Sequence, residues 1–248
     1  MGRRKQRGTA KIILYLVLIF FSVTALYPFL WLIIQSFKTS QDYLSSSKLA
    51  LPRKWYAMNY PQTWQAGSFG KLMFNSVIYT AAATIAATLF GFMAGFAFSK
   101  LKNRASPFLY GSFVVGILIS LQSILIPLFL MIKSAGLYDT RLGVIIPYTG
   151  IALPLAVYLG TEYIRGIPDE LIESARMDGA RYLKIFISVI LPMAAPAAVS
   201  AALLTVCAAW NEFMLINILS FGDRIKSLPV GIYRFSGTLS ADYGKQFT

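Results

Sequence analysis

Long apolar runs with almost no charge alternate with short charged segments along the whole chain. Charge is absent from residues 12–34, and similar runs occupy 74–99, 108–132, 142–163 and 196–219. At about 1.5 Å per residue, a helix over residues 12–34 reaches roughly 35 Å, which is enough to cross a bilayer with some tilt. The pattern therefore predicts an all-α, polytopic membrane protein, a helical bundle in which five spans are visible.

Small residues and prolines predict how these spans pack. The second span, 74–99, is rich in Ala, Gly and Thr, the third is expected to break at Pro127, and the fourth carries Pro147 and Pro154. Small residues allow helix backbones to approach closely in lipid, and proline at membrane depth is tolerated where neighbouring groups satisfy the freed carbonyl. We therefore expect the second and fourth spans to pack within the bundle rather than face lipid all round.

The amino-acid composition excludes several classes of protein. Charged residues make up 13% of the 248 positions, whereas a soluble domain carries about a quarter. The net charge of +13 is distributed between the apolar runs without a continuous basic face, which favours anionic lipid over nucleic acid as a partner. The sequence has no histidine and one cysteine, Cys207, so neither a disulfide framework nor a His-based metal or catalytic site is expected.

The basic residues predict which side of the membrane each segment occupies. If the N-terminus is cytoplasmic, the inside segments 1–11, 100–107 and 164–190 hold 12 Lys and Arg in 46 residues. The outside segments then hold 11 in 77 residues, and they are 35–73, 133–141 and 220–248. The density, with five basic residues before the first span, favours a cytoplasmic N-terminus. We divide the chain into a basic N-terminal segment, 1–11, and a transmembrane domain, 12–248.

Aromatic residues gather in the long segment between the first two spans. Residues 35–71 contain Trp55, Tyr56, Tyr60 and Trp64. Such residues often form an interfacial cap at headgroup level. They would equally serve as part of a dock for an extracytoplasmic partner, and the sequence leaves both interpretations open.

The charged segment between the fourth and fifth spans predicts two short helices joined by a hinge. Pro168 suits the first helical position, and Asp169 with Glu170 complements the positive N-terminus of that helix. Gly179 suits the left-handed residue that ends it. The second helix shows one apolar face at helical spacing, made of Tyr182, Ile185, Phe186 and Val189. Pro192 then begins the return into the membrane, where a continuing helix would be kinked.

An elbow held at both ends by membrane spans would move those spans when something grips it. Periodicity alone leaves this lever and an ordinary amphipathic surface loop equally open. The segment resembles the coupling motif of ATP-binding-cassette importer permeases, which runs Glu-Ala-Ala, three residues, Gly, nine residues, Ile, one residue, Leu-Pro. The matching positions here are Glu173, Ser174, Ala175, Gly179, Val189, Leu191 and Pro192, with Ser174 and Val189 as small departures.

This resemblance implies that the loop 164–192, with Asp178 beside Gly179, docks in a cleft of a cytoplasmic ATPase. ATP binding would close the ATPase dimer and switch the bundle from inward- to outward-facing. The sequence has no Gly-x-x-x-x-Gly-Lys-Ser/Thr phosphate loop. We therefore expect no cofactor on this chain, ATP and Mg on partner ATPase subunits, and a transport subunit rather than an enzyme.

Further segments are similar to the smaller permease subunit of maltose-type carbohydrate importers. They are residues 26–31, 36–39, 75–77, 97–99, 126–128, 136–140 and 210–213. The resemblance implies a type I importer transmembrane domain in a bacterial inner membrane, moving a sugar or small oligosaccharide by alternating access. It also implies a second homologous permease subunit and an extracytoplasmic solute-binding protein as partners. Family members usually finish with a sixth span, so we expect that span to be missing at the C-terminal end, either by truncation or because the sequence lacks it.

Polar residues inside the predicted spans are candidates for the substrate pathway. Asn211 lies about 15 residues after Pro196, roughly 22 Å along a helix and past the membrane midplane. A carboxylate and an amide at that depth are costly unless they face a polar pathway or a partner helix. Trp210, Asn211 and Glu212 therefore suit a sugar site, and Gln122 invites the same interpretation. The alternative is a structural Glu212–Asn211 pair that stabilises the bundle or a subunit interface.

Other functions remain to be weighed against sugar import. The same machinery would carry an amino acid, a polyamine or a phosphonate, and the coupling loop does not separate these cargoes. A membrane-embedded enzyme is disfavoured because the sequence has neither histidine nor an acid pair at catalytic spacing. A secondary transporter would show inverted repeats and buried ion-coupling carboxylates.

Overall fold

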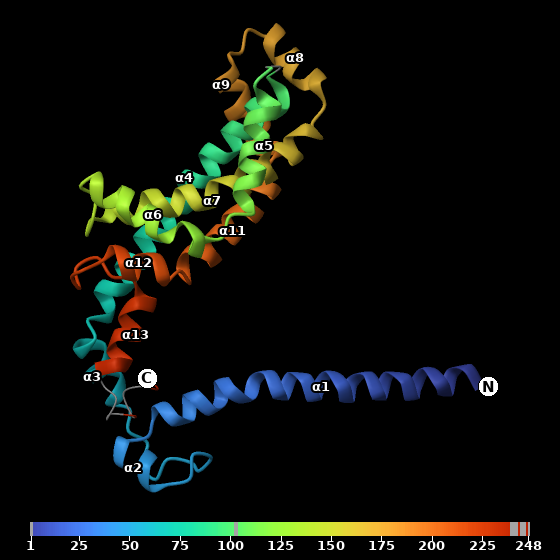
Figure 1. Ribbon diagram of the computed structural model, residues 1–248. Coiled ribbons are helices and arrows are strands. Elements are labelled where there is room, and N and C mark those ends of the chain that lie inside the picture. Colours follow the sequence, from blue (N-terminus) through green and yellow to red (C-terminus); the bar gives the residue numbers. More distant parts are fainter. Residues whose placement is uncertain (1, 102–103, 239–242, 244–246, 248) are drawn as a thin grey trace. The chain divides into compact units, whose positions relative to one another are not determined.

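The computed structural model is α-helical, without a strand in the residues it describes, and the prediction of an all-α protein is confirmed (Figure 1). It describes all residues except 1, 102–103, 239–242, 244–246 and 248. Parts of three predicted segments therefore lie outside the described residues: the inside segments 1–11 and 100–107 and the outside segment 220–248. The helices are α1 (Gly2–Ser36), α2 (Ser40–Ser45), α3 (Asn59–Ala66), α4 (Phe69–Lys100), α5 (Ser106–Ile117), α6 (Leu121–Ser134), α7 (Arg141–Arg165), α8 (Asp169–Met177), α9 (Tyr182–Ile185), the π-helical turn η1 (Phe186–Ile190), α10 (Leu191–Met193), α11 (Ala195–Trp210), α12 (Met214–Leu219) and α13 (Leu228–Thr238).

The chain divides into two compact units. The first contains Met1–Phe69 and Ile232–Thr248, and the second contains Gly70–Gly231. In the first unit, the buried Asn59 amide donates to the carbonyls of Ser36 (2.8 Å) and Lys38 (2.9 Å). These bonds order the aromatic segment 35–71 after α1. Trp55 and Trp64 remain largely exposed, so both interpretations of that segment stand.

Three helices are long and apolar enough to cross a membrane: Lys11–Ser36 of α1, Phe69–Lys100 and Arg141–Arg165. They confirm the first, second and fourth predicted spans as helices. None of the membrane-length window of α1 is buried within the chain, whereas 39% of that of α4 and 33% of that of α7 are. The expectation that the second and fourth spans pack within the bundle is therefore confirmed.

The third predicted span is a bent pair of helices. The axes of α5 and α6 differ by 107° across a break at residues 118–120. Ser120 has an extended backbone (φ −72°, ψ 143°), and a new helix starts directly after it. Serine is a common residue at such a start. Pro127 lies inside α6, so the predicted break at Pro127 is wrong.

The fifth predicted span, 196–219, is also not one helix. The helix α11 ends at Trp210, residues 211–213 are not helical, and α12 follows. At its other end, α11 meets the α9–α10 segment at a bend of 79° beside Ala194. With each bent pair counted as one span, the described residues hold up to five candidate spans, the number that the sequence predicts, but the last of them runs from Tyr182 to Trp210 instead of over 196–219.

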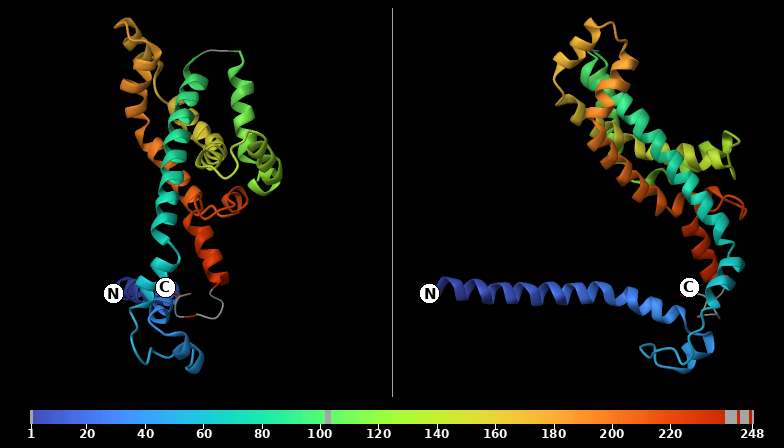
Figure 2. Two further views of the ribbon diagram at one scale, coloured as in Figure 1. Left: turned by 90° about the vertical axis from the view of Figure 1, so that its left-hand side faces the viewer. Right: turned by 180° about the vertical axis from the view of Figure 1, so that it is seen from behind.

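Close backbone contact joins α4 to α7 in the second unit (Figure 2). A Cβ atom built on Gly91 would lie 2.5 Å from the Ala156 Cβ, and one on Gly95 would lie 2.7 Å from the Thr161 nitrogen. Only glycine permits this approach. Two clusters of buried side chains lie along α4, one around Tyr79, Tyr148 and α12, and the other around Phe92, Phe96 and the segment 164–201.

Candidate functional site

The segment between α7 and α11 forms a helical elbow, defined here as residues 166–194. Its first helix, α8, begins at Asp169 with Pro168 as the preceding cap, one residue later than predicted. Gly179 has the predicted left-handed conformation (φ +79°). The Gly179 N–H donates to the Arg176 carbonyl (2.9 Å) and the Ala180 N–H to the Ala175 carbonyl (3.0 Å). This pair of bonds is a Schellman motif, which ends α8 and turns the chain.

The motif residues of the elbow divide into an outer and an inner set. Ala175 and Leu191 are half-buried and pack against the cluster around Phe96. The outer set is exposed and consists of Glu173, Ser174, Asp178, Gly179 and Pro192. Met177, at the tip of the elbow, is 89% exposed, although methionine is apolar. The elbow thus presents a mixed polar and apolar surface around the Gly179 turn.

The second limb of the elbow packs through an apolar face that differs from the predicted one. Ile185, Phe186 and Ile190 are buried, with the Phe186 ring 5.9 Å from that of Phe96. Val189 is half-buried, but Tyr182 is 46% exposed and lies beneath the Arg176 guanidinium. The predicted position of Tyr182 on this face is therefore wrong.

A π-helical turn explains the shift of that face. The Leu191 N–H donates to the Phe186 carbonyl, five residues back, so the turn over Phe186–Ile190 is wider than an α-helical turn. The Pro192 ring would collide with the carbonyl four residues before it in a regular helix. The wide turn comes just before Pro192, and the sharp bend falls at Ala194 instead of at Pro192.

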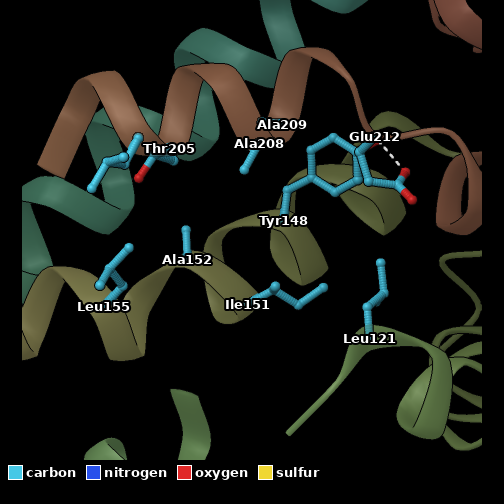
Figure 3. Close-up of a pocket in the computed structure, with 10 residues that line it drawn as sticks. Leu121, Tyr148, Ile151, Ala152, Leu155, Thr205, Ala208, Ala209 and Glu212 are labelled. Atoms are coloured by element: carbon cyan, nitrogen blue, oxygen red, sulfur yellow. Dashed lines mark hydrogen bonds between the residues drawn. The ribbon is translucent and has the colours of Figure 1, made fainter. Parts of the chain in front are cut away.

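A cavity of about 240 Å³ lies between α7 and α11 (Figure 3). It is lined by Leu121, Tyr148, Ile151, Ala152, Leu155, Leu204, Thr205, Ala208, Ala209 and Glu212. Figure 3 shows the Tyr148 side chain pointing toward Glu212, while aliphatic side chains form most of the wall. The cavity is therefore apolar with a polar end formed by Tyr148 and Glu212.

The Glu212 carboxylate is held by three donors. It accepts hydrogen bonds from the Tyr148 hydroxyl (2.7 Å) and from the N–H groups of Leu215 (2.7 Å) and Ile216 (3.2 Å). The two N–H groups belong to the first turn of α12, so Glu212 caps that helix and ties it to α7. A carboxylate has about four lone-pair sites, which leaves one for a further donor.

The other candidate residues of the substrate pathway lie elsewhere. The Asn211 amide donates to the Cys207 carbonyl in the last turn of α11 (2.8 Å), so the alternative of a Glu212–Asn211 pair is not formed within this chain. Trp210 is half-buried outside the cavity lining, and Gln122 is exposed one residue after Leu121. Sequence reasoning missed Tyr148. The available signal was a tyrosine hydroxyl inside a predicted span, since such a group needs an acceptor in lipid.

A polar cluster holds the segment 221–228 at the opposite end of α4 from the elbow. The fully buried Asn75 amide donates to the carbonyls of Arg224 and Lys226, both at 3.0 Å. The Tyr79 hydroxyl donates to the Ile225 carbonyl (2.8 Å), and the Ser76 hydroxyl accepts from the Leu228 N–H (2.8 Å). Asp139 accepts from the Phe221 N–H (3.0 Å). These bonds give segments 75–77 and 136–140 a structural role.

The fold and these sites define a polytopic α-helical membrane protein whose late spans are joined by a glycine-capped elbow. Among the described residues, no group of three or more His, Cys, Asp or Glu is placed to hold a metal ion. Residues 87–228 match the family model described as "Binding-protein-dependent transport system inner membrane component". The match covers more than half of the chain, including the elbow and the cavity. The chain belongs to this family.

Individual relatives agree with this assignment. The chain is 34% identical over 214 residues to the trehalose transport system permease protein SugB of Mycobacterium tuberculosis, covering 86% of this chain and 77% of the relative. It is 31% identical over 233 residues to the diacetylchitobiose uptake system permease protein NgcG of Streptomyces coelicolor, covering 93% and 77%. These relatives support the resemblance inferred from the coupling motif.

The fold is similar to one chain of the crystal structure of a bacterial ABC transporter involved in the import of the acidic polysaccharide alginate. The TM-score is 0.83 at 22% sequence identity, over 98% of this chain and 90% of that chain. The expected fold of an importer transmembrane domain is therefore confirmed.

Proposed function

We propose that this chain is the smaller permease subunit of an ATP-driven importer that moves a sugar or small oligosaccharide across a bacterial inner membrane. Family membership supports the importer. The relatives named for trehalose and diacetylchitobiose, and the structural neighbour that imports alginate, support a carbohydrate cargo. An amino acid, polyamine or phosphonate cargo is the alternative.

The elbow is the proposed dock for a cytoplasmic ATPase dimer, and the observation that carries this proposal is the exposed Schellman turn. Glu173, Ser174, Asp178 and Gly179 are exposed, and Met177 adds an apolar side chain at the tip. The exposed turn lies at the positions that match the coupling motif, from Glu173 to Gly179. ATP and Mg would be bound by the ATPase subunits, which would drive alternating access through the elbow.

A cytoplasmic N-terminus is the proposed orientation. Residue Lys100, which follows the second span, contacts Ile167 and Asp169 of the elbow, so segments 100–107 and 164–190 meet at one end of the second unit. Asp139 bonds to Phe221, so segments 133–141 and 220–227 meet at the other end. This grouping agrees with the inside and outside segments expected from the basic residues.

The remaining proposed partners are a second homologous permease subunit, an extracytoplasmic solute-binding protein and membrane lipid. Apolar side chains of α1 are exposed along its length from Ile12 to Ile33, and lipid or another span would cover them. The exposed Trp55 and Trp64 suit either an interfacial cap or a contact with the binding protein.

The cavity between α7 and α11 is the proposed contribution of this chain to the cargo pathway. Of Trp210, Asn211, Glu212 and Gln122, Glu212 lines the cavity, together with Tyr148. The phenol and the remaining lone pair of the carboxylate would meet the hydroxyl groups of a passing sugar, while the aliphatic wall would meet its apolar faces.

Isolation and reconstitution test this function. The chain is recovered from detergent-solubilised membranes of its source with its bound proteins, and the assembly is reconstituted in liposomes with ATP inside. Uptake of labelled trehalose, maltose and diacetylchitobiose is compared with uptake of an amino acid, a polyamine and a phosphonate. An assembly whose ATPase carries a phosphate-loop lysine-to-alanine change serves as the control.

ATP-dependent uptake of a saccharide would support the proposal. Uptake of only a non-saccharide would replace the cargo and keep the importer. Recovery of the chain without an ATPase would overturn the whole proposal, because no ATPase would then bind the elbow and drive transport.

A further inference from the structure

The second span, α4, ends in a lysine that is bound to the elbow. The Lys100 side chain is 6% exposed, although it is the last residue of α4. Its ammonium group donates to the Ile167 carbonyl and, at 2.6 Å, to the Asp169 carboxylate. These two acceptors lie on either side of Pro168. One cation from α4 therefore holds both sides of the corner where α7 turns into α8.

The backbone at this corner has few other constraints. The helix α7 closes with bonds from the Gly166 N–H to Tyr163 (3.1 Å) and from the Ile167 N–H to Ile164 (3.0 Å). Pro168 has an extended conformation (ψ 138°) and no N–H to donate. The direction of α8 relative to the bundle thus depends on side-chain contacts, and the Lys100 bridge is a charged contact at this corner.

The second limb of the elbow also packs on α4. The Phe96 ring, one turn before Lys100, lies 5.9 Å from the Phe186 ring. The first limb adds Ile167 and Ile172 to the same buried cluster. Both limbs therefore contact the last turns of α4, although α4 is joined to neither by a short connection in the chain.

We propose that Lys100 is a positioning residue that makes α4 part of the lever. The proposal rests on the function proposed above, in which the elbow receives movement from an ATPase. A movement of α8 would pull α4 through Lys100 at the same time as it pulls α7 through the chain. The close contacts of α4 with α7 at Gly91 and Gly95 lie further along both helices, so Lys100 adds a separate connection between α4 and the elbow itself.

The movement would reach the far end of the second unit through α4. From Lys100 to Asn75 is 25 residues, or roughly 37 Å of helix. At Asn75, hydrogen bonds hold the backbone of Arg224 and Lys226. The helix is thus fastened by polar side chains at both ends, to the elbow at one and to segment 221–228 at the other.

Replacement of Lys100 in the complete reconstituted importer tests the proposal. Lys100→Met keeps the apolar stem and removes the ammonium group, and Lys100→Arg keeps a cation that can reach both acceptors. Arg165→Met is the matched control, because Arg165 is at the end of α7 and contacts Glu162 of the same helix (2.9 Å) and the Tyr110 ring of α5, neither of which belongs to the elbow or to α4. The quantity measured is cargo transported per ATP hydrolysed, after the yield of assembled complex has been determined.

We expect Lys100→Met to lower transport per ATP about tenfold, the order of coupling between distant sites in proteins. Lys100→Arg and Arg165→Met should keep the wild-type ratio. A Lys100→Met complex that assembles and keeps the wild-type ratio would overturn the proposal. If Lys100→Met does not assemble, Asp169→Ala decides instead, because it removes the side-chain acceptor from the Lys100 bridge at a position that is 66% exposed. An unchanged ratio of transport to ATP hydrolysis in that variant would also overturn the proposal. Failure of the wild-type complex to transport a saccharide would instead count against the proposed function.

Discussion

Replacement of Gly95 by alanine should separate α4 from α7, because the added methyl group has no space. A Cβ on Gly95 would lie 2.7 Å from the Thr161 nitrogen and 2.8 Å from the Gly160 carbonyl carbon. Both are backbone atoms, so no change of rotamer relieves the contact. Ordinary contact begins at 3.4 Å, and α7 would have to move by roughly 0.7 Å. Overpacking of this kind costs about 1–3 kcal/mol.

Gly150→Ala is the matched control for this change. Gly150 is in α7 as well, but a Cβ there meets no atom within 4 Å. Alanine in place of a helical glycine stabilises by about 0.5–1 kcal/mol when it fits. Gly95 is also helical, so this gain is the same in both variants and cancels. The free energies of unfolding should therefore differ by the overpacking cost of about 1–3 kcal/mol, with Gly95→Ala the less stable.

Thermal unfolding of the detergent-solubilised protein measures this difference. A gap of that size should separate the midpoints by roughly 2–12 °C for a chain of this length. The wild-type midpoint should lie between them. Equal midpoints for Gly95→Ala and Gly150→Ala would refute the reasoning, because the close backbone contact would then impose no steric demand.

Three further changes test the sites. Gly179→Val should leave the protein inserted in the membrane but uncouple ATP hydrolysis from transport, since a β-branched residue in the left-handed region costs about 1–2 kcal/mol. Gly179→Asn should stay coupled, because asparagine accepts that conformation. Unchanged cargo-stimulated ATPase activity of the Val variant would contradict this. Tyr148→Phe should destabilise the protein by about 1 kcal/mol and Glu212→Ala by about 2–3 kcal/mol, because only the second change also leaves two N–H groups of α12 unpaired. A lower unfolding midpoint for Tyr148→Phe than for Glu212→Ala would contradict this expectation. Asn75→Ala should speed hydrogen exchange in residues 221–228, where two carbonyls lose their donor, while Ser112→Ala, which removes an exposed hydroxyl bound within α5, should not.

Features decided by neighbouring residues were predictable from the sequence. The left-handed Gly179 ends α8 through bonds that span six residues, so the local pattern was sufficient to place it. The helices α1, α4 and α7 follow from uninterrupted apolar runs. The exposed and half-buried positions of the elbow were less predictable, because the π-helical turn before Pro192 changes which side chains face the bundle.

Features decided by tertiary contacts were not predictable. The partner of Glu212 across the bundle is Tyr148, which is 64 residues away in the sequence. The neighbour of Glu212 in the sequence, Asn211, instead donates a hydrogen bond to the Cys207 carbonyl in the last turn of α11. Likewise, the break at residues 118–120 in the uncharged run 108–132 is marked only weakly, by Ser120, whereas Pro127 is a strong helix breaker that lies within a helix.

The two missed breaks have one physical explanation, which concerns the cavity. Non-helical backbone at membrane depth is tolerated only where it is buried in protein or borders a cavity. Leu121 follows the first break, Glu212 lies in the second, and both line the same cavity of about 240 Å³ beside Tyr148. A sequence-based prediction that treats each span as a uniform rod therefore misplaces the polar residues where the helices open. In this chain those openings are also where we expect cargo to pass.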